Sequence, residues 1–151
     1  MKTDIVPATT KEHFAFIAKR FEETITLWEN YKATPTSVRK RKAQLLKWSK
    51  DKNVHLTVAL GPSRKTVAFN SVYISKDYSG NAYGKIVILY VLPNFRGNGI
   101  AASLKAEGET WLRSMEVTKI LTEIDAKNAR MLKLNKKAGF KIKSYTFERG
   151  I

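Results

Sequence analysis

The sequence predicts a single mixed α/β domain, in which a sheet of about six strands with an antiparallel N-terminal meander is flanked by about four helices. Apolar residues first recur at helical spacing and then follow strand patterns. The last third of the chain alternates strand and helix patterns. The 151 residues, 43% hydrophobic and 27% charged, suit one globular domain spanning residues 1–151.

The N-terminal third is expected to hold one short strand and two helices. Residues 4–8 have a strand pattern, and Thr9 followed by Glu12 forms a capping box that opens a first helix. Residues 34–37 end this segment and begin a second helix, which runs to about Ser49. The apolar positions of the two helices are Phe14, Ile17, Phe21, Ile25 and Trp28, then Val38, Leu45, Leu46 and Trp48.

The middle of the chain has the pattern of an antiparallel meander, and the last third alternates helix and strand. The meander strands are expected at 54–60, 66–74 and 85–92, with a turn at 61–65 and a polar loop at 75–83. Beyond a loop at 93–99, we expect a helix over 100–115, a strand over 119–124, a helix over 126–137 and a last strand over 140–147.

The formal net charge is +15, which is high for so short a chain. Such a charge indicates an anionic partner, such as nucleic acid, a phosphorylated cofactor or an anionic surface. The alternative is a solvated basic surface without a target.

Several function classes are excluded by what the sequence lacks. The chain has no cysteine, which excludes disulfides, thiolate metal sites and a cysteine nucleophile and suits the cytoplasm. The longest apolar run, residues 86–93, is too short to span a bilayer, and Met1 to Asp4 lack the apolar core of a signal peptide. For that reason we expect no membrane segment. The two histidines are dozens of residues apart, so we expect no metal site.

The most informative segment is the loop between the strand at 85–92 and the following helix. The first N–H groups of a helix have no partner within the helix, and the helix dipole is positive at that end. Together, these two effects favour the binding of an anion there. Gly97 and Gly99 let the backbone turn sharply and approach a phosphate, and Arg96 adds a charge. The loop alone indicates a phosphate site; it is neither a Walker A loop nor a complete dinucleotide fingerprint.

Taken with its surroundings, this segment resembles the GNAT superfamily of acetyl-CoA-dependent N-acyltransferases. The family's loop reads Arg/Gln-x-x-Gly-x-Gly/Ala, and Arg96, Gly99 and Ala101 fill it. The lead-in from Val91 to Ile100 and an Asn128 followed by Gly139-Phe140 are also present at matching spacing. The resemblance is sharpest over residues 86–140 and implies an N-acetyltransferase that moves an acetyl group from acetyl-CoA to a primary amine.

The resemblance also implies a set of coenzyme-binding residues. Backbone amides of the loop would bind the pyrophosphate, and the strand end would expose backbone groups to the pantetheine arm and polarise the thioester carbonyl. Asn128 would hydrogen-bond the coenzyme arm, or else serve only as a polar residue at a helix start. The implied cofactor-binding residues are Leu89, Val91, Arg96, Gly97, Asn98, Gly99, Ile100, Ala101, Asn128 and Asn135.

The acid and base of the reaction are the points at which the sequence departs from the family. Many members carry a tyrosine that protonates the leaving thiolate where this chain has Asn135, so we name Tyr90 and Asn135 as candidate catalytic residues, with water as a further acid. The strand before the loop lacks the family's glutamate. A water chain can serve as the base, or one of Glu22, Glu23, Asp77, Glu123 and His55.

The distribution of charge bears on the acceptor. Residues 32–52 hold eight Lys/Arg against one acid, and residues 127–143 hold seven against none. The first cluster lies on the second helix, which flanks the acceptor cleft in this fold. Basic residues 39–50 therefore favour an anionic or nucleic-acid-associated acceptor. The alternative is a catalytically weak or inactive basic module of the same fold that binds nucleic acid; a monomer and a homodimer both remain open.

Overall fold

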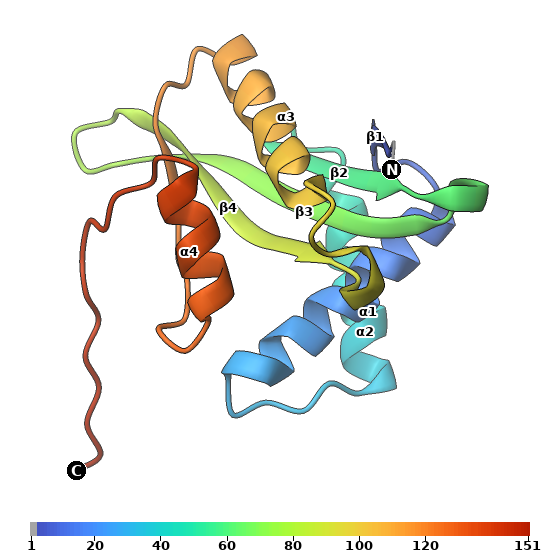
Figure 1. Ribbon diagram of the computed structural model, residues 1–151, viewed down its shortest axis with the longest axis horizontal. Helices are drawn as coiled ribbons and strands as arrows, with labels where there is room; N and C mark the ends of the chain where they lie inside the picture. The colour runs from blue at the N-terminus through green and yellow to red at the C-terminus, as the bar shows by residue number, and fades with distance from the viewer. Residues whose placement is uncertain (1–2) are drawn as a thin grey trace.

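The computed structural model describes residues 3–151 and shows a five-stranded sheet with helices on both faces (Figure 1). The strands lie in sequence order: β1 (Asp4–Pro7), β2 (Val54–Leu60), β3 (Thr66–Lys76), β4 (Ala82–Val91) and β5 (Ile120–Thr122). Neighbours from β1 to β4 are antiparallel, and β5 is parallel to β4. The predicted mixed α/β class and the antiparallel meander are confirmed.

Helices α1 (Lys11–Trp28) and α2 (Pro35–Trp48) cover one face of the sheet. Phe14, Ile17 and Phe21 of α1 and Leu45 of α2 are buried in one cluster with Phe69 of β3. These are the apolar positions that the helical periodicity predicted. Trp48 packs against Phe21, with ring centroids 6.4 Å apart, and so belongs to this core.

Helix α3 (Ile100–Ser114) packs on the opposite face, and α4 (Ala129–Lys137) lies alongside the sheet on that side (Figure 1). Ile100 and Leu104 of α3 are buried against Ala59 and Ala68 of the sheet. Within residues 3–151, no helix combines the length and apolar composition needed to cross a bilayer.

The first helix is capped one residue later than predicted. The N-cap is Thr10, whose hydroxyl accepts from the backbone N–H of His13 at 3.1 Å, and not Thr9 with Glu12. The imidazole Nδ1 of His13 in turn accepts from the backbone N–H groups of Thr9 and Thr10. His13 thus takes the reciprocal place that the sequence assigned to Glu12.

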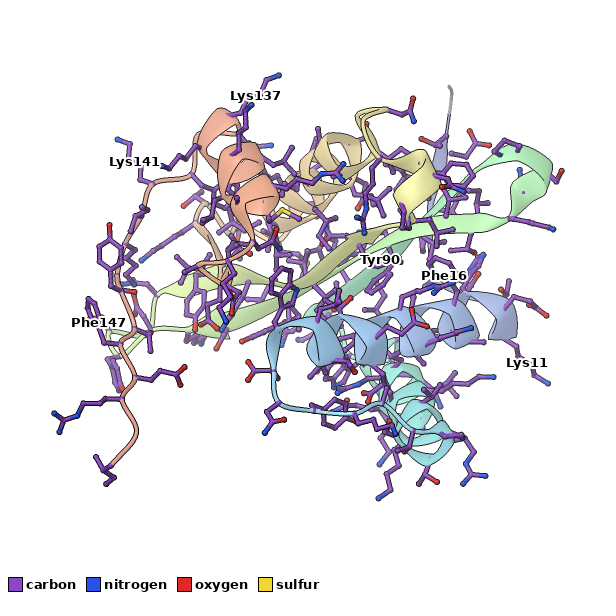
Figure 2. All side chains as sticks on the ribbon, turned by 60° about the horizontal axis from the view of Figure 1, so that its bottom comes forward. Lys11, Phe16, Tyr90, Lys137, Lys141 and Phe147 are labelled. Atoms are coloured by element: carbon purple, nitrogen blue, oxygen red, sulfur yellow. The ribbon has the colours of Figure 1, made fainter. Side chains whose placement is uncertain are left out.

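The predicted last strand over residues 140–147 is wrong. In the described chain the segment after Phe140 has no strand, and beyond α4 it runs to the C-terminus as an extended tail (Figure 1). Its apolar side chains are exposed, including Phe147, which Figure 2 shows outside the body of the domain. Alternating residues need a strand partner to form a ladder, and none lies beside the tail; the described sheet therefore has five strands, not about six.

Two short 3₁₀ turns and a hairpin complete the chain. The turns are η1 (Pro62–Arg64) and η2 (Pro93–Phe95), and η2 leads from β4 into the predicted anion loop. Strands β3 and β4 extend further into the 75–83 region than predicted, leaving a short turn in which Asp77 accepts from the backbone N–H groups of Ser79 and Asn81.

Candidate active site

The end of the loop and the first turn of α3 present a run of free backbone N–H groups, whereas the N–H of Arg96 donates to the carbonyl oxygen of Pro93 at 3.2 Å. Gly97 and Gly99 have φ angles of +83° and +76°, which an L side chain adopts only with strain. Among the described residues, no acceptor pairs with the backbone N–H groups of residues 97–102. A Cβ added at either glycine would meet nothing within 4 Å, so the space in front of the loop is open. These features fit a pyrophosphate.

The side chain of Arg96 points back toward the strand. Its Nε donates to the backbone oxygen of Val91 at 2.9 Å, and its guanidinium carbon lies 5.9 Å from the centroid of the Tyr90 ring. Arg96 therefore links the loop to the end of β4 through its Nε, and the outer nitrogens of its guanidinium are the donors that can bind an anion.

Strand β4 loses its neighbour on one side just before this loop. The parallel pairing with β5 covers only Gly84, Lys85 and Ile86, whereas pairing with β3 continues to Val91. From Val87 onward, the edge of β4 that faces β5 has no strand partner in the described sheet. Backbone groups of Leu89 to Val91 thus border a gap that begins where β4 and β5 separate.

The side chains of this strand end point to opposite faces of the sheet. Leu89 and Val91 pack toward α3, in the cluster of Ile100 and Leu104. Tyr90 packs on the other face, where its ring is stacked on Phe69 with centroids 6.1 Å apart. Figure 2 shows Tyr90 and Phe16 in the layer between the sheet and α1. Tyr90 is thus separated by the sheet from the α3 side.

Asn128 and Asn135 occupy different positions on α4, which begins at Ala129 and not at Ala126. Asn128 is the N-cap, and its side-chain oxygen accepts from the backbone N–H of Met131 at 3.2 Å. Asn135 is buried and accepts a hydrogen bond from the ammonium of Lys105 on α3. Asn128 therefore has the structural use that the sequence left open, while Asn135 faces α3.

Lys105 is the residue of this region that the sequence analysis missed. Its side chain is 5% exposed, and its Nζ lies 4.8 Å from the centroid of the Phe140 ring. Burial lowers the pKa of Lys105 below its ordinary value, and the Glu109 carboxylate opposes this shift in part. Its burial could have been predicted from its spacing, because Lys105 lies two helical turns before Leu112, on the buried stripe of α3.

The candidate bases on the N-terminal helices are held by structural partners. Glu22 is 2% exposed and accepts from Arg41 Nε at 2.8 Å and from the hydroxyl of Tyr31. Burial raises the pKa of Glu22, but hydrogen bonds from Tyr31, Arg41 and Ser37 outweigh it, so the pKa lies below its ordinary value. A carboxylate that holds its proton so weakly is a poor base.

The other four candidates are likewise engaged. Glu23 pairs with Arg20 at 2.6 Å, and the largely exposed Glu123 pairs with Lys85 at 2.7 Å. His55 Nε2 lies 2.8 Å from Glu107 Oε1, and its ring stacks on Trp111 of α3. Asp77 closes the β3–β4 turn, where its backbone hydrogen bonds lower the pKa of its carboxyl. The structure brings none of the five to the loop at the start of α3.

The basic face of α2 is smaller than the sequence count indicates. Arg41 lies over the Phe21 ring, 4.1 Å from its centroid, and its charge is paired with Glu22. Arg39, Lys40, Lys47 and Lys50 remain exposed. A hollow of about 390 Å³ lies beside Arg41, between α1 and α2. Its lining consists of Glu22, Tyr31, Ser37, Lys40, Arg41 and Gln44.

The described residues include no group of three or more side chains that could hold a metal ion. The site is thus defined by a strand that parts from its neighbour and a glycine loop that opens a helix with unpaired N–H groups. This arrangement fits a phosphorylated ligand that lies along the free edge of β4.

Comparison with known proteins shows the family: the chain belongs to the acetyltransferase (GNAT) family, whose model matches residues 21–140. The match includes β4, the loop, α3 and α4, and it confirms the resemblance found in the sequence. The chain is therefore a member of a family of acyltransferases. No curated protein sequence matches it.

Solved structures share the fold across the whole chain. A proposed acetyl transferase from Pyrococcus furiosus is similar at 20% identity and a TM-score of 0.80, over 99% of this chain and 100% of the other. An aminoglycoside 6'-N-acetyltransferase from Acinetobacter baumannii gives 15% identity and a TM-score of 0.73, over 99% of both chains. Glucosamine-6-phosphate N-acetyltransferase from Arabidopsis thaliana gives 17% and 0.68, again over 99% of both. At these identities the likeness shows the fold alone.

Proposed function

We propose that this protein is an acetyl-CoA-dependent N-acetyltransferase that acetylates a primary amine on an anionic acceptor. The observation that carries the proposal is the set of unpaired N–H groups over residues 97–102, at the point where β4 has lost β5 as its neighbour. In this arrangement the loop holds the pyrophosphate of the donor, and the free edge of β4 holds its pantetheine arm.

In this proposal the protein accelerates the reaction by positioning the two substrates and by stabilising the negative charge that develops on the thioester oxygen. The acceptor amine attacks the carbonyl carbon of the thioester, and a backbone N–H on the free edge from Leu89 to Val91 stabilises the oxygen that becomes negative. Water takes the proton that the amine loses, since the five candidate bases are held elsewhere. Tyr90 does not serve as the acid, because its ring lies on the α1 face of the sheet.

A binding experiment on one glycine tests the donor site. Gly99→Trp places a large side chain at the loop and a strained residue at positive φ, so calorimetry should show no binding of acetyl-CoA. Gly80→Trp is the matched control, because Gly80 has a φ of +81° and open space at the far tip of the β3–β4 hairpin. Equal binding by wild-type protein and Gly99→Trp, or none by the wild type, would contradict the donor site.

The charge of α2 carries the acceptor part of the proposal. Arg39, Lys40 and Lys47 are exposed on α2 and Lys50 is exposed just beyond its end, and no acidic residue lies on the helix. Acidic clefts suit cationic amines, whereas this surface favours an acceptor that bears phosphate or carboxylate groups beside its amine. Nucleic acid and nucleic-acid-bound proteins belong to this class.

An acceptor screen with acetyl-CoA, read by thiol release and mass spectrometry, tests this choice. The chain has no cysteine, so every thiol detected comes from the donor. Turnover of an anionic acceptor should fall as salt rises from about 50 to 200 mM, and Lys40→Glu should weaken it further. Efficient, salt-insensitive turnover of a free polyamine would contradict an anionic acceptor. Salt-sensitive nucleic-acid binding without coenzyme binding would favour the alternative, a catalytically inactive basic module.

A further inference from the structure

Lys105 is a cation buried at a position where the fold offers it no anion. Its side chain is 5% exposed, and within the described chain no carboxylate lies at ion-pair distance from its Nζ. Its hydrogen bond goes to the neutral carboxamide of Asn135, and the ring of Phe140 lies 4.8 Å from the Nζ. A buried charge without a counter-ion is costly, so a protein that keeps one usually uses it for a ligand.

The position of Lys105 is next to the gap in the sheet. Leu104, the preceding residue of α3, is buried in the cluster that Leu89 and Val91 of the free strand end pack against. Phe140, which faces the ammonium, packs on a second cluster that Leu89 also contacts. The ammonium therefore lies between α3 and α4, beside the stretch of β4 that has no strand partner.

The charged surroundings of Lys105 are few. On its own helix Glu109 is the nearest acid, and Arg113 hydrogen-bonds to that acid at 3.3 Å. Helix α4 contributes the neutral Asn135 and otherwise only bases, namely Arg130, Lys133, Lys136 and Lys137. The stretch of β4 that lines the gap has Tyr90 as its one titratable side chain, and that ring lies on the opposite face.

We infer that Lys105 is the proton donor to the leaving thiolate, and that Asn135 positions its ammonium. The inference rests on the proposed function, because it assumes that acetyl-CoA lies along the free edge of β4. The tetrahedral intermediate collapses, the carbon–sulfur bond breaks, and its electron pair stays on sulfur. Sulfur then takes a proton from Lys105 Nζ, which leaves coenzyme A as the thiol and Lys105 as a neutral amine.

No further reagent is needed to balance the protons in this step. The acceptor nitrogen loses one proton when it becomes an amide, and Lys105 regains one from water. Burial favours this role, because desolvation lowers the pKa of Lys105 and so makes its ammonium a stronger acid than an exposed lysine. The pair of Lys105 and Asn135 thus supplies the acid that the sequence lacks at position 135.

The first test measures the thiol of bound coenzyme A and needs no acceptor. Thiolate absorbance is followed against pH with the coenzyme bound; the chain has no cysteine, so the signal belongs to the coenzyme. An ammonium within about 4–6 Å should lower the pKa of the bound thiol by about 1 or more. Lys105→Met should raise it again, whereas Lys19→Met, which removes an exposed lysine on α1, should leave it unchanged.

The second test measures thiol release from acetyl-CoA, with an acceptor from the screen or with water. Lys105→Met should lower kcat by about 100-fold, as loss of a general acid does, while calorimetry shows acetyl-CoA binding within about threefold of wild type. Lys105→Met is expected to fold, because an apolar side chain of similar length replaces a buried cation. Adding Asn135→Tyr to Lys105→Met should restore at least about tenfold of the rate, since a phenol then faces the gap.

The outcomes separate this inference from the proposed function. Wild-type protein that binds no coenzyme overturns both. Wild-type protein that binds and turns over acetyl-CoA, with an unchanged thiol pKa and rate in Lys105→Met, overturns the proton donor and leaves the proposed function intact. A loss of coenzyme binding that accounts for the whole loss of rate also overturns it, since Lys105 would then be a binding residue.

Discussion

Replacing Arg41 should destabilise the fold far more than replacing any other lysine or arginine of α2. Arg41→Met leaves the Glu22 carboxylate buried, at 2% exposure, with the hydroxyls of Tyr31 and Ser37 as its remaining side-chain donors. Breaking a buried ion pair by removing one partner costs about 3–5 kcal/mol. The Arg41 side chain is 20% exposed, which places the expected loss at the lower end of that range, about 3 kcal/mol.

The assay is thermal and urea unfolding at several pH values. A loss of about 3 kcal/mol corresponds to a fall in Tm of about 6–12 °C for a chain of this size. Arg39→Met is the matched control: it removes the same charge from an exposed position of the same helix, and should change stability by less than about 0.5 kcal/mol.

The pH dependence gives a second, independent check. The folded-state pKa of Glu22 lies below the ordinary value of 4.5, so its stabilising contribution is complete above 4.5 and is lost as pH falls through the folded-state pKa. In Arg41→Met, burial dominates and Glu22 takes up a proton at higher pH. The gap between the two proteins should therefore be largest near neutrality and narrow in acid. A gap under about 1 kcal/mol at neutral pH, or a gap that widens in acid, would refute this reasoning.

Three further perturbations have defined outcomes. Gly84→Ala should cost about 1–3 kcal/mol in urea unfolding, because a Cβ there would lie at or within 3.0 Å of three carbons of Leu112, and Leu112→Ala should remove most of that added cost. Burial lowers the pKa of His13, so the cap that its neutral imidazole forms should be complete above 6.5 and be lost as pH falls through the lower folded-state pKa. His13→Gln should unfold with a flatter dependence on pH in this range, and an unchanged dependence would count against the cap. Deleting residues 142–151 should leave Tm within about 2 °C, since surface changes are small, whereas a larger fall would indicate that the tail packs in solution.

The helices and the meander could be predicted because local patterns determine them. Phe14, Ile17 and Phe21 lie on one helical stripe, and that stripe is the buried face of α1. The end of the chain could not be predicted in the same way: residues 140–147 alternate as a strand does, but alternation does not show whether a partner strand lies alongside. The cap of α1 shifted by one residue because Thr9 and Thr10 are equally good N-cap residues.

In the candidate site, too, features that depend on local sequence could be predicted and long-range contacts could not. The loop from Arg96 to Gly99 could be located because its glycines and the following helix are adjacent in sequence. The contact between Lys105 and Asn135 joins residues 30 positions apart, and no local pattern reveals it. The family match confirms the class of protein, while the roles of individual residues in the site stay predictions.

The two edges of β4 should differ in how fast their amides exchange with deuterium. Successive residues of a regular strand direct their N–H groups to opposite edges, so beyond the bulge at Val87 every second amide from Ile88 to Val91 faces β3 and the others face the gap. In the free protein, exchange should therefore alternate between slow and fast along a single strand. A ligand in the gap would slow the fast set alone and make the strand uniform, so residue-resolved exchange can detect an occupied gap without knowledge of the acceptor.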